Sequence, residues 1–383
     1  MKLKPIFILP ILLTLALAVG GLSLILRDDV PVPEHTVPPT EPSEMVEPTE
    51  AVTVSETEEP TEEITEAATE EATENAAVES DTIFTLTFVG DCTFGSTETN
   101  WTYGSSFVQT VGEDYSYPFA NVADIFKNDD FTLANLEGPL TEVGTPAEKE
   151  FVFRGKPEYT AILTEGGVEA VTIANNHILD YDYEGRTATK ENLVSAGIAY
   201  GAREECFLYT TESGLTVGVY CDDFAFDRTH MQETFAALRA QGAEVVICAF
   251  HWGEERDYTP NQNEIDWGHV AIDAGADIVA AHHPHVLQPM EFYNGGVILY
   301  SLGNFSFGGN AMPSDMDTAI IQQQIVRSPE GSISLGELTV IPCSVSSVTS
   351  HNNFQPTPYE IGSEGYDRVL QKLMGTYTAP VVE

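Results

Sequence analysis

Apolar and polar positions along the chain predict alternating strands and helices from residue 83 onward. Strands are predicted at 83–89, 131–136, 168–174, 215–220, 244–250, 277–281, 297–300, 318–326 and 332–341. Apolar residues at helical spacing predict helices at about 119–126, 185–196, 229–241, 265–272 and 363–374. Such alternation is typical of an α/β domain in which helices pack on sheets.

Polar side chains that bind metals or exchange protons follow five of these apolar runs. They are Asp91, Glu137, Asn176 with His177, His251, and His283 with His285. In open α/β sheets, ligands bind in the crevice outside the carboxyl ends of the strands. We therefore expect these side chains to converge on one site, although they are spread from residue 91 to residue 285.

The residue types in this set predict a metal-dependent hydrolytic site. Carboxylates, an amide and imidazoles, with no sulfur, suit one or two divalent ions such as Zn, Mn, Fe or Mg. A carboxylate such as Glu137 can bridge two ions about 3.5–4 Å apart, and a water held between them becomes a nucleophile near neutral pH. His177, next to the candidate ligand Asn176, is then placed as the acid for the leaving group or as a contact to the oxyanion.

Each of these residues taken alone also has a purely structural explanation. An Asp after Gly often caps a turn or a helix, and the pair Asn175-Asn176 is compatible with an Asx turn. His251 fits a buried core histidine equally well. The occurrence of the set at successive strand ends is what favours a site. We interpret four further histidines as structural: His35, His230, His269 and His351.

The first 27 residues have the character of a membrane anchor. Residues 5–26 contain no charge and are mostly Leu, Ile, Ala and Val, and a helix of that length spans a bilayer core of about 30 Å. Lys2 and Lys4 precede this run, which predicts a cytoplasmic N-terminus and an extracytoplasmic domain. A cleaved signal peptide is less favoured, because cutting after Ala18 would leave the apolar segment 19–26 at the new terminus.

Residues 28–80 have the composition of a disordered stalk. They contain 17 acidic residues, no Lys or Arg, no Gly and no Phe, Tyr or Trp. Such a tract buries too little apolar surface to offset a chain entropy of about 1–2 kcal/mol per residue. We expect an acidic Glu/Thr/Pro stalk that holds the domain at 81–383 away from the membrane.

Charge and cysteine content narrow the function further. The chain has 60 acidic and 16 basic residues, a net charge of −44. Three of the basic residues lie in 1–27 and 17 acids in 28–80, so 81–383 keeps 43 acids and 13 basic residues, a net charge of −30. This balance argues against nucleic-acid binding, which needs a basic face.

The five cysteines contain no C-x-x-C motif and are odd in number, so we expect no disulfide framework.

Short motifs in a fixed order resemble the CapA family, the capsule or poly-γ-glutamate biosynthesis proteins also called PgsA. They run from about 84 to 308: Val89-Gly90-Asp91, Asn135-Leu136-Glu137-Gly138, Ala174-Asn175-Asn176-His177 with Asp180, His251-Trp252-Gly253 with Glu255, Ala276-Asp277, His283-Pro284-His285-Val286 with Gln288, and Tyr300-Ser301-Leu302-Gly303-Asn304-Phe305. The resemblance implies a calcineurin-like metallophosphoesterase fold. In that fold two packed mixed β-sheets are flanked by helices, a four-layer αββα sandwich, here with C-terminal strands and a helix to about residue 376.

The resemblance also implies roles for individual residues. The implied metal ligands are Asp91, Glu137, Asn176, His251, His283 and His285. His177 would be the catalytic histidine, Arg154 in Phe153-Arg154 the anion contact, and Asn304 a neighbour of the site. The chain departs from metallophosphoesterases at Asp91-Cys92-Thr93, where they have D-x-H, so one imidazole ligand is missing.

Three functions are compatible with these features. The leading hypothesis is a membrane-anchored, extracytoplasmic protein of capsule or poly-γ-glutamate biosynthesis or export, with a metal-dependent site for a phosphoester or a γ-glutamyl amide. The second is a non-catalytic polymer-binding or export subunit of a polymer synthase complex. The third is a surface metallophosphoesterase unrelated to capsule. The expected partners are an anionic capsule polymer or a phosphoester substrate, the membrane, and subunits of a synthase complex.

Overall fold

The computed structural model describes residues 80–203, 205–223 and 226–379. The predicted anchor at 1–27 and nearly all of the predicted stalk at 28–80 lie outside these residues and remain predictions. Within the described residues, no helix combines the length and the apolar character that a membrane crossing requires.

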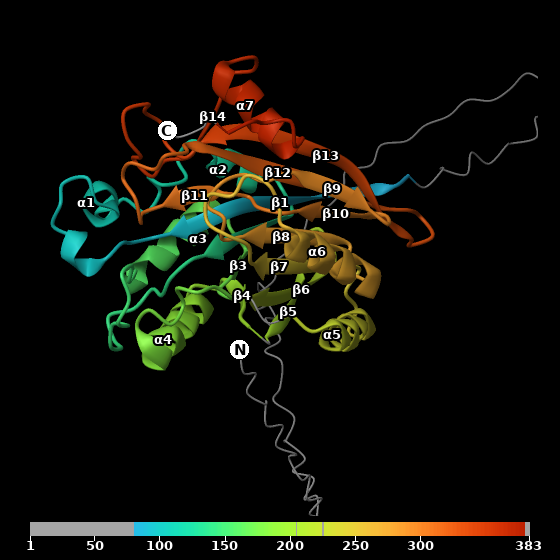
Figure 1. Cartoon of the computed structure of the whole chain (residues 1–383). Coiled ribbons are helices and arrows are strands. Elements are labelled where there is room, and N and C mark those ends of the chain that lie inside the picture. The colour runs from blue at the N-terminus through green and yellow to red at the C-terminus, as the bar shows by residue number, and fades with distance from the viewer. Residues whose placement is uncertain (1–79, 204, 224–225, 380–383) are drawn as a thin grey trace, which may run out of the picture. The chain divides into compact units, whose positions relative to one another are not determined.

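Two mixed β-sheets form the middle of the domain (Figure 1). The larger sheet has the order β14-β13-β12-β1-β2-β3-β4, and β11 also pairs with β1. Its strands are β1 (Thr82–Thr93), β2 (Phe131–Leu136), β3 (Ala170–Thr172), β4 (Ala199–Gly201), β11 (Asn304–Phe307), β12 (Asp317–Arg327), β13 (Ile333–Ser344) and β14 (Thr357–Pro358). The smaller sheet has the order β5-β6-β7-β8-β10-β9. Its strands are β5 (Cys206–Thr210), β6 (Thr216–Asp223), β7 (Val245–His251), β8 (Ile278–His282), β9 (Met290–Tyr293) and β10 (Gly296–Leu299).

Helices cover the outer faces of both sheets. The helices are α1 (Phe107–Val111), α2 (Ala123–Phe126), α3 (Thr160–Gly166), α4 (Asp182–Ser195), α5 (Arg228–Ala240), α6 (Gln262–Ala274) and α7 (Glu364–Leu373), with two short 3-10 helices at Glu98–Asn100 and Pro157–Tyr159. Apolar residues of α1 to α4 share a core cluster with one face of β1, β2 and β3. Those of α5 and α6 share another with β7, β8 and β10.

A third core cluster lies between the two sheets. Phe84, Leu86 and Leu133 from the larger sheet pack in it with Val217 and Ile247 from the smaller one. The buried apolar side chains of α7, Val369 and Leu373, belong to the same cluster, so α7 closes it over β12 and β13. The order helix, sheet, sheet, helix confirms the predicted four-layer architecture.

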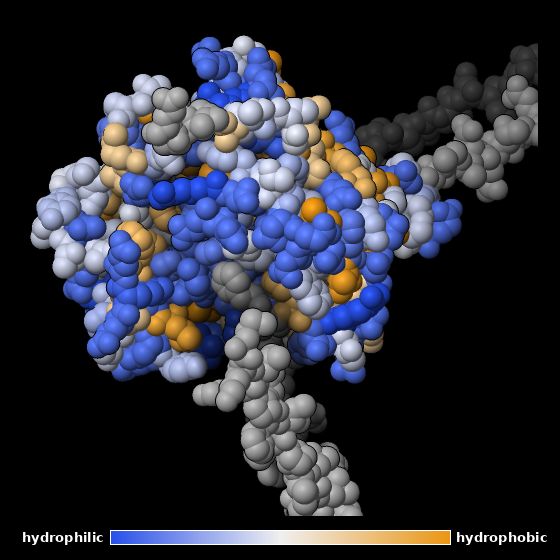
Figure 2. All heavy atoms as spheres, in the orientation of Figure 1, coloured by the Kyte–Doolittle hydropathy of each residue, from blue (hydrophilic) through white to orange (hydrophobic). Residues whose placement is uncertain are grey.

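The longer predicted elements are found with small shifts at their ends, whereas the helix predicted at 119–126 is mostly absent. Only Ala123–Phe126 is helical there. Phe119 is buried all the same, because its ring packs on Phe126 and Phe305 from a turn. The helical spacing of apolar residues in this segment therefore indicated buried side chains, but not a helix. On the face shown in Figure 2, hydrophilic residues predominate and hydrophobic residues form small separate groups.

Candidate metal centre

Strands from both sheets bring the candidate residues to one edge of the sandwich. Asp91 lies in β1 and faces Asn304, the first residue of β11, in their parallel pairing. Glu137 follows β2 directly, His251 is the last residue of β7, and His283 follows β8. Because β1 packs against β8 across the sandwich, side chains far apart in sequence become neighbours.

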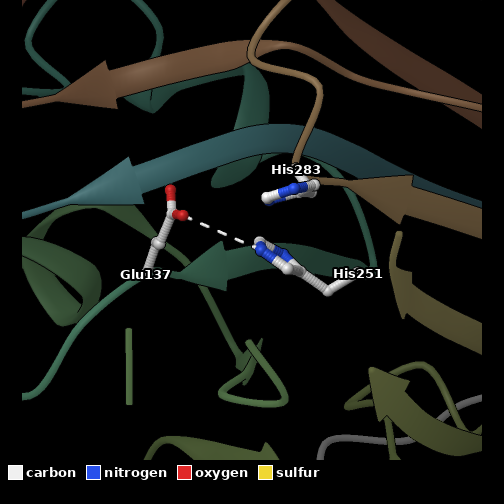
Figure 3. Close-up of side chains that lie close together, drawn as sticks. All are labelled: Glu137, His251 and His283. Atoms are coloured by element: carbon white, nitrogen blue, oxygen red, sulfur yellow. Dashed lines mark ion pairs between the residues drawn. The ribbon is translucent and has the colours of Figure 1, made fainter. Parts of the chain in front are cut away.

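The donor atoms form two clusters that share one carboxylate. Glu137, His251 and His283 make the first, Asp91, Glu137 and His285 the second, and within each the donor atoms lie within 4.8 Å of one another. Glu137 Oε1 lies 3.8 Å from His251 Nε2 and 3.9 Å from His285 Nε2. In Figure 3, Glu137, His251 and His283 approach one another from three separate segments. Glu137 is thus common to both clusters, and its bridging role toward two ions stays a prediction.

Asp91 is held by three side chains of its surroundings. Asn135 Nδ2 donates to Asp91 Oδ1 at 2.8 Å, and His282 Nδ1 lies 3.3 Å from the same oxygen. His285 Nδ1 lies 3.1 Å from Asp91 Oδ2. The sequence analysis assigned no role to Asn135 or His282. Asn135 appears there only within the motif around Glu137, and the one signal for His282 is its position beside His283.

The three predicted histidine ligands divide between the two clusters. The rings of His251 and His283 have centroids 4.7 Å apart, whereas those of His283 and His285 are 6.0 Å apart. Both residues flanking Pro284 have left-handed backbone, with φ of 100° at His283 and 57° at His285. This turn places the two imidazoles in different clusters, His283 in the first and His285 in the second. Asn176 Oδ1 lies 2.8 Å from His251 Nε2 and joins the first cluster.

The two carboxylates differ strongly in acidity. Burial raises the pKa of Glu137 to about 7, against the opposing effect of His285. Burial acts in the same direction on Asp91, but hydrogen bonds with His282 and His285 outweigh it and hold the pKa of Asp91 well below its usual range. Burial disfavours the charged form of His285, yet Glu137 and Asp91 together raise its pKa to about 10. The two acids therefore attract a positive charge to the second cluster.

The histidines of the first cluster behave in the opposite way. Burial, and then the nearby His283, hold the pKa of His251 well below its usual value. Burial and His285 lower the pKa of His283 to about 4. Both rings are therefore neutral near pH 7, which is the form of imidazole that binds a metal ion.

His177 lies beside these clusters and is positioned by a different set of groups. Its Nδ1 lies 2.7 Å from Asp180 Oδ2, and Asp180 Oδ1 forms an ion pair with Lys149 Nζ at 2.6 Å. Lys149 Nζ also donates to the carbonyl oxygen of Asn176 at 3.1 Å. The ring of Phe153 stacks on His177 with centroids 4.5 Å apart. Lys149 was not predicted, because a single lysine in a loop carries no motif.

A cavity of about 330 Å³ opens next to the centre. His177, His285 and Asn304 line it together with Phe153, Phe307 and Arg256. Asn304 Oδ1 lies 2.9 Å from His285 Nδ1, so it adjoins the centre as expected.

Arg154, the predicted anion contact, lies elsewhere. Its guanidinium bonds to Glu98 Oε1 at 2.7 Å and packs between the rings of Trp101 and Tyr181. Arg154 is not among the residues that line the cavity. Its role toward an anion stays a prediction from the resemblance, and the structure offers a different arginine at the cavity.

The residues fit a divalent metal. Glu137 Oε1 is buried and accepts no hydrogen bond from the described residues, an arrangement that is costly unless a cation satisfies the oxygen. The carboxylates of Asp91 and Glu137, the imidazoles of His251, His283 and His285 and the amide oxygen of Asn176 form the nitrogen and oxygen donor set expected for such an ion.

Comparison with known proteins identifies relatives of this chain. The sequence profile of the family described as bacterial capsule synthesis protein PGA_cap matches residues 85–220 and 207–309. PGA biosynthesis protein CapA of Bacillus subtilis (strain 168) is 30% identical over 276 residues, 66% of this chain and 70% of that protein. Capsule biosynthesis protein CapA of Bacillus anthracis is 28% identical over 295 residues, 70% of each chain. A probable polyglutamine synthesis accessory protein of Mycobacterium tuberculosis is 28% identical over 226 residues, 50% of this chain and 60% of that one.

Two solved structures are also similar. The NAD nucleotidase of Haemophilus influenzae matches with a TM-score of 0.39 and 13% identity, over 77% of this chain and 63% of that one. The protein TT1561 of Thermus thermophilus matches with a TM-score of 0.38 and 10% identity, over 67% of this chain and 99% of that one. Both scores lie below 0.5, so the sequence comparisons alone decide the family.

Proposed function

This chain belongs to the PGA_cap family of bacterial capsule synthesis proteins, and from that premise we propose that it takes part in poly-γ-glutamate or capsule biosynthesis through a metal-dependent hydrolase-like site. The observation that carries the proposal is the pair of donor clusters that share Glu137. A buried carboxylate between two sets of donors is the arrangement that holds two ions for in-line displacement.

The chemistry of the proposed site is hydrolysis of a phosphoester or of a γ-glutamyl amide. A divalent ion, when bound, would polarise the scissile group and lower the pKa of a water. Glu137, Asp91 and the clustered histidines would hold it. His177 would act on substrate: with Nδ1 engaged by Asp180, Nε2 is the ring atom left to carry a proton into the cavity.

We also propose the placement that the sequence predicts. The apolar segment 5–26 would anchor the chain in the membrane, and the acidic tract 28–80 would hold the domain outside it. An extracytoplasmic position suits a protein that handles a surface polymer, and synthase subunits in the membrane would be its neighbours.

A non-catalytic polymer-binding or export subunit is the second candidate, and one observation favours it. Thr93 stands where metallophosphoesterases have a histidine, and its hydroxyl lies 3.5 Å from Glu137 Oε2. Among the described residues, the second cluster therefore has three donors from Asp, Glu and His side chains, namely Asp91, Glu137 and His285. A site with fewer ligands binds its ion more weakly, so the centre would then organise the polymer without cleaving it.

One experiment separates these functions. The purified chain is loaded in turn with Mn, Zn, Fe or Mg and given a phosphodiester and a γ-glutamyl oligomer. Metal-dependent cleavage of the oligomer supports the proposal, and cleavage of the phosphodiester alone supports a general surface metallophosphoesterase. Metal binding and oligomer binding without any cleavage support the non-catalytic subunit.

A further inference from the structure

One arginine lines the cavity beside the candidate metal centre and has no carboxylate partner among the described residues. Five of the eight arginines in the described part of the chain pair with a carboxylate. Arg256 forms no such pair, and neither do Arg186 and Arg228. Of these three, only Arg256 lines the cavity, together with His177 and His285.

The segment that carries Arg256 is fixed to the turn that carries the histidine ligands. The amide of Arg256 donates to the carbonyl oxygen of Pro284 at 2.8 Å. The side chain of Gln288 donates to the carbonyl oxygen of Asp257 at 3.0 Å. Arg256 has left-handed backbone, with φ of 66°, a conformation that non-glycine residues keep only where their surroundings hold them. The position of Arg256 relative to His285 is therefore set by the fold.

The charges around the cavity leave Arg256 available to a ligand. Asp315 also lines the cavity, but its carboxylate bonds to Lys372 Nζ at 2.6 Å and is neutralised. Glu255, the neighbour of Arg256 in sequence, lines the cavity too, yet the two form no ion pair. In a domain with a net charge of −30, the general field repels anions, so an anion must be attracted locally. The planar guanidinium of arginine suits a carboxylate or a phosphate, which it binds through two parallel hydrogen bonds.

We propose that Arg256 binds an anionic group of the substrate in this cavity, a carboxylate or a phosphate, while the reacting group lies at Glu137 and the clustered histidines. The inference rests on the proposed function, because it names the substrate class of the same site. In a γ-linked glutamate chain every residue keeps a free α-carboxylate close to the amide bond. Such a polymer therefore presents an anion next to each bond that could be cleaved. A phosphoester substrate would present a phosphate oxygen instead.

Binding to the full chain tests this inference without relying on turnover. Three probes are titrated calorimetrically: a γ-linked glutamate oligomer, the same oligomer with its α-carboxylates converted to amides, and inorganic phosphate. The variants are Arg256→Gln, Arg256→Lys and the control Arg228→Gln, which removes the same charge from an exposed arginine at the start of α5. Thermal unfolding of each variant confirms that it is folded.

We expect Arg256→Gln to weaken binding of the anionic oligomer on the order of 10–100-fold, the usual worth of a charge-assisted hydrogen bond. Arg256→Lys should retain part of the affinity, and Arg228→Gln should retain all of it. Binding of the amidated oligomer should be the same in wild type and in Arg256→Gln. If phosphate binding falls instead, the anion is a phosphate. Unchanged binding of both anions by Arg256→Gln, or no anion binding by the wild-type chain, overturns the inference.

Hydrolysis measured on the same preparations separates this result from the proposed function. Loss of anion binding in Arg256→Gln without cleavage by any form would uphold the inference and reject the hydrolase. If the wild-type chain cleaves a substrate but Arg256→Gln binds the anion as tightly as wild type, the hydrolase is supported and the inference about Arg256 is rejected.

Discussion

Asp317 and Glu137 are both buried carboxylates, 2% and 1% exposed, but their surroundings differ. Arg368 donates two hydrogen bonds of 2.6 Å to Asp317, one to each oxygen, and Lys372 Nζ lies 2.7 Å from Oδ2. Tyr359 adds a hydroxyl donor at 3.0 Å. Burial would raise the pKa of Asp317, but Arg368 and Lys372 outweigh it and lower the pKa. The network joins α7 to the start of β12, and its carboxylate is fully satisfied by the chain itself.

Glu137 has no comparable partner. One of its oxygens accepts no hydrogen bond from the described residues, and its pKa is raised to about 7. The nearest nitrogens belong to His251 and His285, at 3.8 and 3.9 Å. A carboxylate that stabilises the fold is paired within the chain, whereas one reserved for a cation is left open. The contrast between these two acids locates the functional site more clearly than burial does.

The largest effect expected from this comparison is on folding stability. Asp317→Ala removes the partner of Arg368 and of the buried Lys372, and should lower the free energy of unfolding by about 3–5 kcal/mol. Glu137→Gln, measured with a chelator present, should change it by less than about 1 kcal/mol, because Glu137 Oε1 has no hydrogen bond to lose. Urea unfolding measures both. Equal losses in the two variants would mean that Glu137 is a structural acid after all.

A second prediction concerns catalysis at the candidate metal centre around Glu137. His177→Ala should reduce any hydrolysis by about 10²–10⁴-fold, the usual contribution of a positioned proton donor, and leave metal content nearly unchanged. Asn176→Ala should lower both, because its amide oxygen lies 2.8 Å from His251 Nε2 within the first cluster. Elemental analysis beside a rate assay gives the two readings. Loss of metal in His177→Ala would make His177 a ligand and not a proton donor.

The smallest predicted effect is a pH dependence of the free energy of unfolding, and it involves neither the Asp317 network nor the metal centre. Burial, with a further contribution from Asp129, raises the pKa of Glu169 to about 7, above an unfolded value of about 4.3. The folded state therefore favours the protonated acid, so this contribution to stability is full below about pH 4 and is lost as pH rises to 7.

Glu169→Gln should remove the loss of stability that the ionisation of Glu169 causes as pH rises. The expected gain at pH 7.5 is on the order of 1 kcal/mol, since Glu169 is partly exposed and solvent screens its charge. Urea unfolding of wild type and variant at pH 5 and pH 7.5 measures it. A gain that is the same at both pH values would show that the ionisation of Glu169 is not its cause.

The fold was largely predictable because long apolar runs dominate it. The segments 131–136 and 244–250 have the length and composition of buried strands and became β2 and β7 within a residue at either end. The short elements β4, β11 and α1 were not predicted, because three to five residues are too few to show a periodic pattern.

The convergence of the candidate residues was predictable from the sequence, whereas their detailed arrangement was not. Strand ends that share an edge brought Asp91, Glu137 and His251 together, as their positions after apolar runs suggested. His283 and His285 fall in different clusters because both residues have left-handed backbone around Pro284. Neither residue type predicts that backbone conformation. The ion pair of Arg154 with Glu98 was equally unpredictable, since Glu98 lies 56 residues away in sequence and only the fold makes it a partner.

Metal stoichiometry tests the central claim, that two clusters share Glu137. Wild type, Glu137→Gln and His283→Ala are loaded with Mn or Zn, dialysed and analysed for metal per chain. We predict about two ions for wild type, about one for His283→Ala, and almost none for Glu137→Gln, since Glu137 belongs to both clusters. Full metal content in Glu137→Gln, with the variant folded, would contradict the account.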